Sequence, residues 1–157
     1  MDLRPKLTGW LQDALAIEEA MIRILGRHLV AAAHYPQLAE RLRQHLADTR
    51  RHAEQVHGCL KALGGSRSTL ESAAARVMTA LQTAADLLLA DQVLTNTAAE
   101  AGLEHLEIAT YCAIAAAADQ AGERETAKTI REIMAEDQAM ADWLAGHLPV
   151  LTRQYLT

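Results

Sequence analysis

The sequence has no phenylalanine, and all aromatic residues together make up only 3% of its 157 residues. Strands favour aromatic and β-branched residues, so their scarcity argues against a β-rich fold. Only three prolines are present, Pro5, Pro36 and Pro149. Between them lie long stretches rich in alanine and leucine, which are strong helix formers. These absences indicate an all-α protein.

Further absences limit the compartment and the partners. Two cysteines, Cys59 and Cys112, fit a reducing compartment better than a disulfide framework. No uncharged apolar run approaches the ~20 residues that cross a bilayer, and residues 1–6 lack the apolar segment of a signal peptide. The net charge of −5 lacks the basic footprint of a nucleic-acid binder. We therefore expect a cytoplasmic protein that binds neither nucleic acid nor membrane.

The spacing of apolar residues predicts four long helices and one shorter helix within a single domain, residues 1–157. The predicted helices cover about 10–33, 37–63, 70–89, 91–121 and 123–148. Tight connections make an antiparallel hairpin of the first two helices and another of the last two. The shorter helix lies in a long crossover between the hairpins, which is one pattern of a four-helix bundle. We expect Thr8 to cap the first helix, Pro149 to close the last, and residues 150–157 to pack outside the bundle.

Each long helix carries a carboxylate in or beside its apolar face, where a charge is costly unless something compensates it. These carboxylates are Glu18, Asp48, Glu107 and Glu136, with Glu104 and Asp137 flanking the last two. Counted from the turns at about 1.5 Å per residue, they lie within a few ångströms of common levels. His45 and His52 fall in the apolar face of the second helix. Two divalent cations would balance four carboxylates, and imidazole would favour iron, manganese or zinc.

Four short segments carry a family resemblance, and they are spread over the long helices. The segments are Ala16–Glu18, His45–Thr49, Leu103–Tyr111 and Glu136–Asp137. With them the chain resembles the YciE/YciF-type ferritin-like proteins, a bacterial stress-associated group with a dinuclear metal site. The string from Glu104 to Tyr111 is the most specific of the four, and the resemblance extends over nearly the whole chain.

The resemblance implies a ferritin-like bundle that holds two iron ions, with manganese or zinc as other candidates. The implied ligands are Glu18, Asp48, Glu107 and Glu136 in the leading positions, followed by Glu104, Asp137 and His52. It also implies a ferroxidase-type reaction with oxygen or peroxide and a role in oxidative stress. Alanine-rich helix faces permit close packing of two copies, so we expect a homodimer. Tyr111, one turn beyond Glu107, is a candidate to hydrogen-bond a ligand or to act as a redox group.

The chain departs from the family pattern in ways that leave a second hypothesis open. Asp48 stands where the family usually has Glu, and His52 stands where Gln is expected. Arg51 and Ala139 occupy the histidine positions of the expected Glu-x-x-His pairs. The alternative function is therefore a structural or interaction bundle of the stress response whose metal site is degenerate or vacant. His45 is expected to be a hydrogen-bonded core histidine rather than a ligand.

Overall fold

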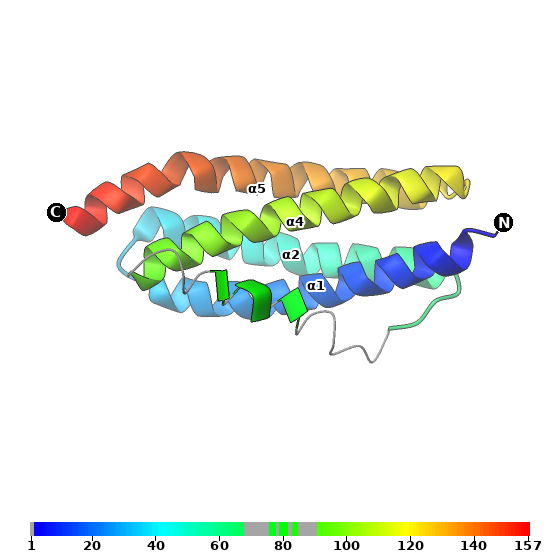
Figure 1. Cartoon of the computed structure of the whole chain (residues 1–157), viewed down its shortest axis with the longest axis horizontal. Coiled ribbons are helices and arrows are strands. Elements are labelled where there is room, and N and C mark those ends of the chain that lie inside the picture. The colour runs from blue at the N-terminus through cyan, green and yellow to red at the C-terminus, as the bar shows by residue number, and fades with distance from the viewer. Residues whose placement is uncertain (1, 68–75, 78, 82, 85–90) are drawn as a thin grey trace.

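The computed structural model describes residues 2–67, 76–77, 79–81, 83–84 and 91–157. Four long helices lie side by side with roughly parallel axes (Figure 1). They are α1 (Arg4–Ala31), α2 (Pro36–Ala62), α4 (Gln92–Gln120) and α5 (Arg124–Leu156). The described residues contain no strand, and none of their helices is long and apolar enough to span a membrane. The predicted all-α bundle of two antiparallel hairpins is confirmed.

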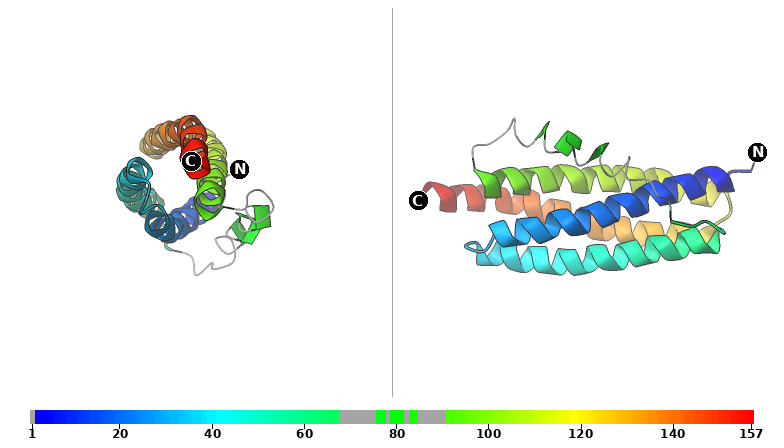
Figure 2. Two further views of the ribbon diagram at one scale, coloured as in Figure 1. Left: turned by 90° about the vertical axis from the view of Figure 1, so that its left-hand side faces the viewer. Right: turned by 90° about the horizontal axis from the view of Figure 1, so that it is seen from below.

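The two hairpins pack side by side so that the four helices surround one interior (Figure 2). Besides the hairpin contacts of α1 with α2 and of α4 with α5, α1 packs against α4 and α2 packs against α5. Neighbouring helices run antiparallel, so the end of α1, the starts of α2 and α4 and the end of α5 share one end of the bundle (Figure 1). This arrangement brings residues far apart in the sequence to the same level.

Two helix ends differ from the sequence prediction. The helix α1 begins at Arg4 with Pro5 in its first turn, so Thr8 lies inside the helix rather than at its cap. Proline suits a first turn because the N–H that it lacks would have no partner there. The helix α5 continues through Pro149 to Leu156. Leu151 is fully buried in the core, and its burial offsets the hydrogen bond that Pro149 removes.

Most of the helix predicted at 70–89 lies outside the described residues. The described residues of this segment, 76–77, 79–81 and 83–84, are helical. Val77 and Leu81 pack against the core cluster nearest the α1–α2 turn. Figure 2 shows these short pieces outside the ring of long helices.

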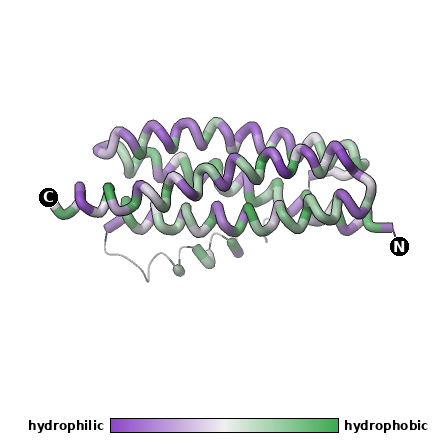
Figure 3. Tube along the Cα trace, turned by 90° about the horizontal axis from the view of Figure 1, so that it is seen from above, coloured by the Kyte–Doolittle hydropathy of each residue, from purple (hydrophilic) through white to green (hydrophobic). Residues whose placement is uncertain are grey.

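Two apolar clusters fill the interior, one toward each end of the bundle. The hydropathy colouring shows hydrophilic residues recurring between apolar ones along every long helix (Figure 3). One cluster takes its α1 residues from positions 7–15, and the other takes them from positions 17–25. Buried polar residues fill the level where the clusters meet. This polar layer comprises Glu18, His45, Thr49, His52, Glu104, Glu107 and Asp137.

Candidate metal centre

The polar layer draws side chains from all four long helices. Of the residues predicted as metal ligands, five lie in it and are at most 3% exposed: Glu18 of α1, His52 of α2, Glu104 and Glu107 of α4, and Asp137 of α5. Each lies within or beside the apolar stripe of its helix, so packing of that stripe carries the carboxylate or imidazole inward. The folding of four amphipathic helices therefore concentrates charge at one level.

Three groups of residues bring ligand atoms within 4.8 Å of one another. The first group is Glu18, His52 and Asp137, the second is Glu104, Glu107 and Asp137, and the third is His45, Glu100 and Glu104. Successive groups share one carboxylate, Asp137 and then Glu104. The arrangement is a row of adjacent clusters, and the first two are compatible with a di-metal site.

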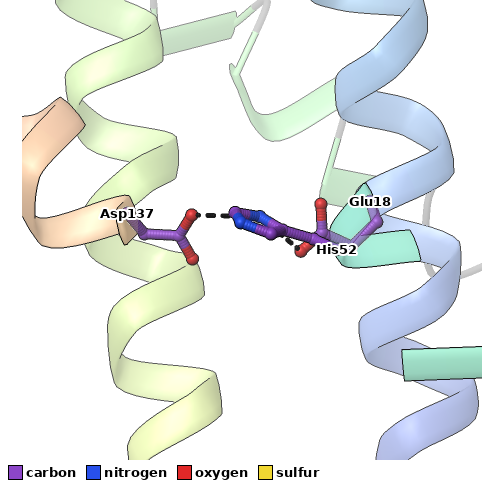
Figure 4. A group of neighbouring side chains, drawn as sticks. All are labelled: Glu18, His52 and Asp137. Atoms are coloured by element: carbon purple, nitrogen blue, oxygen red, sulfur yellow. Dashed lines mark ion pairs between the residues drawn. The ribbon is translucent and has the colours of Figure 1, made fainter. Parts of the chain in front are cut away.

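His52 lies between the carboxylates of two other helices (Figure 4). Its Nδ1 atom is 3.8 Å from Oε1 of Glu18 and 3.5 Å from Oδ1 of Asp137. On its other side, Nε2 is 2.9 Å from Oε2 of Glu136. One nitrogen therefore faces the interior and the other faces the rim of the bundle.

Several buried atoms of the layer have no hydrogen-bond partner within the described part of the chain. They are Nδ1 of His52, Oε2 of Glu104, Oε1 of Glu107 and Oδ2 of Asp137. Buried polar atoms are normally paired, and each unpaired one costs about 1–3 kcal/mol. All four atoms are metal-ligand types, and cations held in the first two groups would satisfy them. The residues present thus fit a metal group.

The pKa values of these carboxylates are raised, because burial and mutual repulsion disfavour their ionised forms. Burial raises the pKa of Glu18 to about 8, and the neighbouring Glu104 adds to this rise. Burial likewise raises the pKa of Asp137 to about 9, with Glu104 again adding to it. Burial and the charge of Glu18 raise the pKa of Glu107 well above its ordinary value. The carboxylates therefore take up either protons or cations.

Two side chains hold carboxylates of the layer in place. The buried hydroxyl of Tyr111 donates a hydrogen bond to Oε1 of Glu18. Nε2 of His45 lies 2.7 Å from Oε1 of Glu104 and can donate a hydrogen bond to it. His45 is thus a hydrogen-bonded core histidine, as expected from the sequence. It also belongs to the third group.

Asp48 and Glu136, predicted as leading ligands, lie at the rim rather than in the buried layer. Their side chains are 35% and 44% exposed, and both form ion pairs with Arg51. Burial acts to raise the pKa of Glu136, but hydrogen bonds from His52 and Arg51 outweigh it and lower the pKa. The structure does not bring these two carboxylates together with Glu107.

The two Glu-x-x-His motifs are expected from the sequence at positions 48/51 of α2 and 136/139 of α5. In the structure, the buried positions lie one residue later on each helix. They read Thr49-x-x-His52 and Asp137-x-x-Met140, and all four residues are buried. A threonine thus replaces the glutamate of one Glu-x-x-His pair, and a methionine replaces the histidine of the other. The apolar stripes of α2 and α5 indicate this shift in the sequence, since Thr49 belongs to the first stripe and Met140 to the second.

Glu100 is the one residue of the three groups that sequence reasoning did not connect to the site. It is buried, and its Oε2 atom is 2.9 Å from Nδ1 of His28. Its position one heptad before Glu107 is the available sequence signal. Glu100, Glu104 and Glu107 form a continuous acidic row on one face of α4.

A model of the domain of unknown function DUF892 matches residues 2–157 of the chain. A solved structure from Xanthomonas campestris pv. campestris is 31% identical and has a TM-score of 0.83, with 98% of this chain and 96% of that chain covered. The stress protein YciF of E. coli is 22% identical with a TM-score of 0.79, over 93% of this chain and 94% of its own.

A bacterioferritin of Desulfovibrio desulfuricans, described with a diiron site in different catalytic states, is 23% identical with a TM-score of 0.76. The match covers 99% of this chain and 86% of the bacterioferritin. At this identity, YciF and bacterioferritin establish the fold alone. The predicted ferritin-like bundle and the resemblance to the YciF type are confirmed.

Proposed function

This chain belongs to the DUF892 family and has a ferritin-like fold, and on that basis we propose that it is a di-iron carboxylate protein with ferroxidase-type activity. One observation carries the proposal. Two buried ligand groups adjoin through Asp137, and their inward-facing atoms have no other partner among the described residues. Such a layer is unfavourable as bare carboxylates and favourable around cations.

Charge balance sets the expected number of ions. Glu18, Glu104, Glu107 and Asp137 carry four negative charges when ionised, which two divalent cations neutralise. Glu18 and His52 would hold one ion, Glu104 and Glu107 would hold the other, and Asp137 is available to both. The mixture of imidazole and carboxylate favours iron, manganese or zinc over magnesium and calcium. The sequence predicts Asp48 and Glu136 as ligands too, but the two ions do not require them.

The surrounding residues position the ligands and keep water away. Tyr111 fixes the Glu18 carboxylate through its hydroxyl, and His45 fixes Glu104. The apolar clusters on either side of the layer exclude bulk water. At the rim, Glu136 accepts hydrogen bonds from His52 and Arg51, which orients the imidazole. Bound iron would supply the one-electron exchange with oxygen or peroxide.

A role in oxidative stress is part of the proposal, supported by the similar E. coli protein that is named a stress protein. The competing function, a structural bundle with a vacant site, is favoured by Met140, whose thioether is a poor ligand for iron. The two functions differ in whether the buried carboxylates bind metal.

Anaerobic titration with Fe(II), followed by metal analysis and oxygen uptake on exposure to air, tests the proposal. We expect the metal-free protein to bind two iron ions in the layer and to consume oxygen. The double variant Glu18→Gln, Asp137→Asn should lose both properties. Glu54→Gln is the matched control, because Glu54 is an exposed carboxylate of α2. Less than one bound equivalent in protein refolded with excess Fe(II) would overturn the proposal and favour the vacant bundle.

A further inference from the structure

We propose that His45, Glu100 and Glu104 form a third divalent-cation site, and that transition-metal ions reach the interior through it from His28. The site shares Glu104 with the di-metal centre proposed above, but its other residues lie outside that centre. It is displaced from the centre along α4, toward the end of the bundle where α4 begins.

The three residues bring a built set of donors together. Ligand atoms of His45, Glu100 and Glu104 lie within 4.8 Å of one another, and all three residues are at least 98% buried. Oε1 of Glu100 and Oε2 of Glu104 lack a hydrogen-bond partner in the portion of the chain that the structure describes. Two buried carboxylate oxygens are thus free to accept a cation beside an imidazole.

Two histidine–carboxylate pairs alone do not account for this arrangement. His45 pairs with Oε1 of Glu104, and His28 pairs with Oε2 of Glu100. Each pair uses one oxygen of its carboxylate and leaves the other oxygen buried and unpaired. If each pair were purely structural, desolvation of that second oxygen would be unfavourable and no interaction would offset it. A bound cation removes this cost for both carboxylates.

The charge and chemistry of the cluster define what it binds. Glu104 is shared with the di-metal centre, so a third divalent cation gains only the charge of Glu100 when ionised and is half balanced. The imidazole of His45 selects for transition metals. We therefore expect the third site to bind more weakly than the di-metal centre and to exchange its ion.

His28 connects this cluster to the surface. Its side chain is 11% exposed, whereas Glu100, its partner at 2.9 Å, is 1% exposed. A cavity of about 10 Å³ is lined by His28, Asn96, Thr97 and Glu100 among its residues, a volume close to that needed for one water molecule or ion. Among the described residues, Glu100 is the one carboxylate that lines this cavity, so a cation held there would bind to it.

From Glu100, the acidic row of α4 leads inward. Glu100, Glu104 and Glu107 are spaced by four and then three residues, so they project from one helix face over about 10 Å. Each carboxylate belongs to a ligand group that adjoins the next group. The row thus provides successive ligands from the partly buried His28 to the centre of the layer.

Anomalous scattering from wild-type crystals soaked in zinc tests the site without any variant. We expect a zinc peak at coordination distance, about 2.0–2.2 Å, from the ligand atoms of His45, Glu100 and Glu104. This peak should be separate from the peaks beside Asp137. Crystals that show zinc beside Asp137 alone would overturn the third site and leave the di-metal centre intact.

Zinc stoichiometry measured by equilibrium dialysis gives the second readout. Wild-type protein should bind three equivalents, and Glu100→Gln should bind two with an unchanged circular dichroism spectrum. Glu54→Gln is the exposed control and should bind three. If the di-metal centre failed instead, wild type would bind one equivalent that Glu100→Gln abolishes. Equal binding by wild type and Glu100→Gln would refute the third site.

The access role is tested by the rate of loading. His28→Ala should slow zinc uptake by the di-metal centre severalfold in stopped-flow measurements, with little change in the final occupancy of that centre. His105→Ala, an exposed histidine of α4, should load at the wild-type rate. If His28→Ala took up zinc at the wild-type rate, ions would reach the di-metal centre by another route.

Discussion

The hydroxyl of Tyr111 donates a hydrogen bond to Oε1 of Glu18, which ties α4 to α1 in the middle of the bundle. Both residues are buried, so water does not replace the bond when one partner is removed. Burial acts to raise the pKa of Glu18, and the hydrogen bond from Tyr111 opposes this rise. Tyr111 therefore favours the ionised carboxylate, the form that binds a cation.

Removing this hydroxyl should weaken both the fold and metal binding. Tyr111→Phe keeps the ring in place and leaves a buried carboxylate oxygen unpaired, so we expect a loss of about 1–3 kcal/mol in unfolding free energy. Zinc affinity of the centre should fall about tenfold because Glu18 loses its orienting partner. Urea unfolding and zinc titration measure the two effects. Tyr155→Phe, at an exposed tyrosine of α5, is the control and should match wild type.

The metal-free protein should lose stability as the pH rises. Glu18 has an ordinary pKa of 4.5 and a folded pKa of about 8, so the folded state binds more protons than the unfolded state between these values. Stability therefore decreases with pH across this window. Asp137 extends the loss to about pH 9. Urea unfolding of metal-free protein at a series of pH values measures this slope.

Added zinc should reverse that trend, because cations replace the protons at high pH. The stabilisation by a fixed zinc concentration should grow from acid to alkaline conditions. Metal-free protein whose stability is flat or rises through the window would contradict the raised pKa values of Glu18 and Asp137.

Neighbouring carboxylates on α5 and α2 allow a direct comparison of buried and rim positions. Asp137→Asn should remove most metal binding, because Asp137 belongs to both groups of the proposed centre. Asp48→Asn should leave zinc stoichiometry unchanged and shift stability by less than about 0.5 kcal/mol, since its side chain is partly exposed. Metal analysis after dialysis distinguishes the two variants. Loss of an equivalent in Asp48→Asn would place Asp48 among the ligands.

The helix beyond Pro149 should contribute to stability. Leu151→Ala removes a fully buried side chain from the cluster nearest the α1–α2 turn, and we expect a loss of about 2–5 kcal/mol. Leu156→Ala is the matched control, because Leu156 is 75% exposed and should change little. Thermal and urea unfolding measure both. Equal stability of the two variants would mean that this end of α5 adds nothing to the core.

Periodicity predicted the bundle well because its helices are long and each buries a single stripe. The two tight connections at 32–35 and 121–123 contain strong helix-ending signals, such as Gly122 with its positive φ of 75°. The start at Arg4 was missed because Thr8 was interpreted as the N-cap, and the end at Leu156 was missed because Pro149 was interpreted as a boundary. Burial of Leu151 overrides that local signal.

The site was harder to predict than the fold, since adjacent residues on a helix differ by only about 100° in direction. The sequence favoured Asp48 and Glu136 as leading ligands, whereas Thr49 and Asp137 occupy the buried positions next to them. The height of a residue along the bundle, counted from the turn, does not determine which of two adjacent residues points inward. That choice depends on the rotation of α2 and α5 about their axes, which packing sets. At the rim, Arg51 forms ion pairs with both Asp48 and Glu136.

The polar layer divides the apolar interior in two, and this division has a mechanical consequence. Cohesion across this waist depends on how well its charges are neutralised, and less on apolar contact than at the two ends. In the absence of neutralisation, the halves on either side should open with some independence. Amide exchange would then be faster at the waist than near the tips, the reverse of an ordinary bundle that frays from its ends.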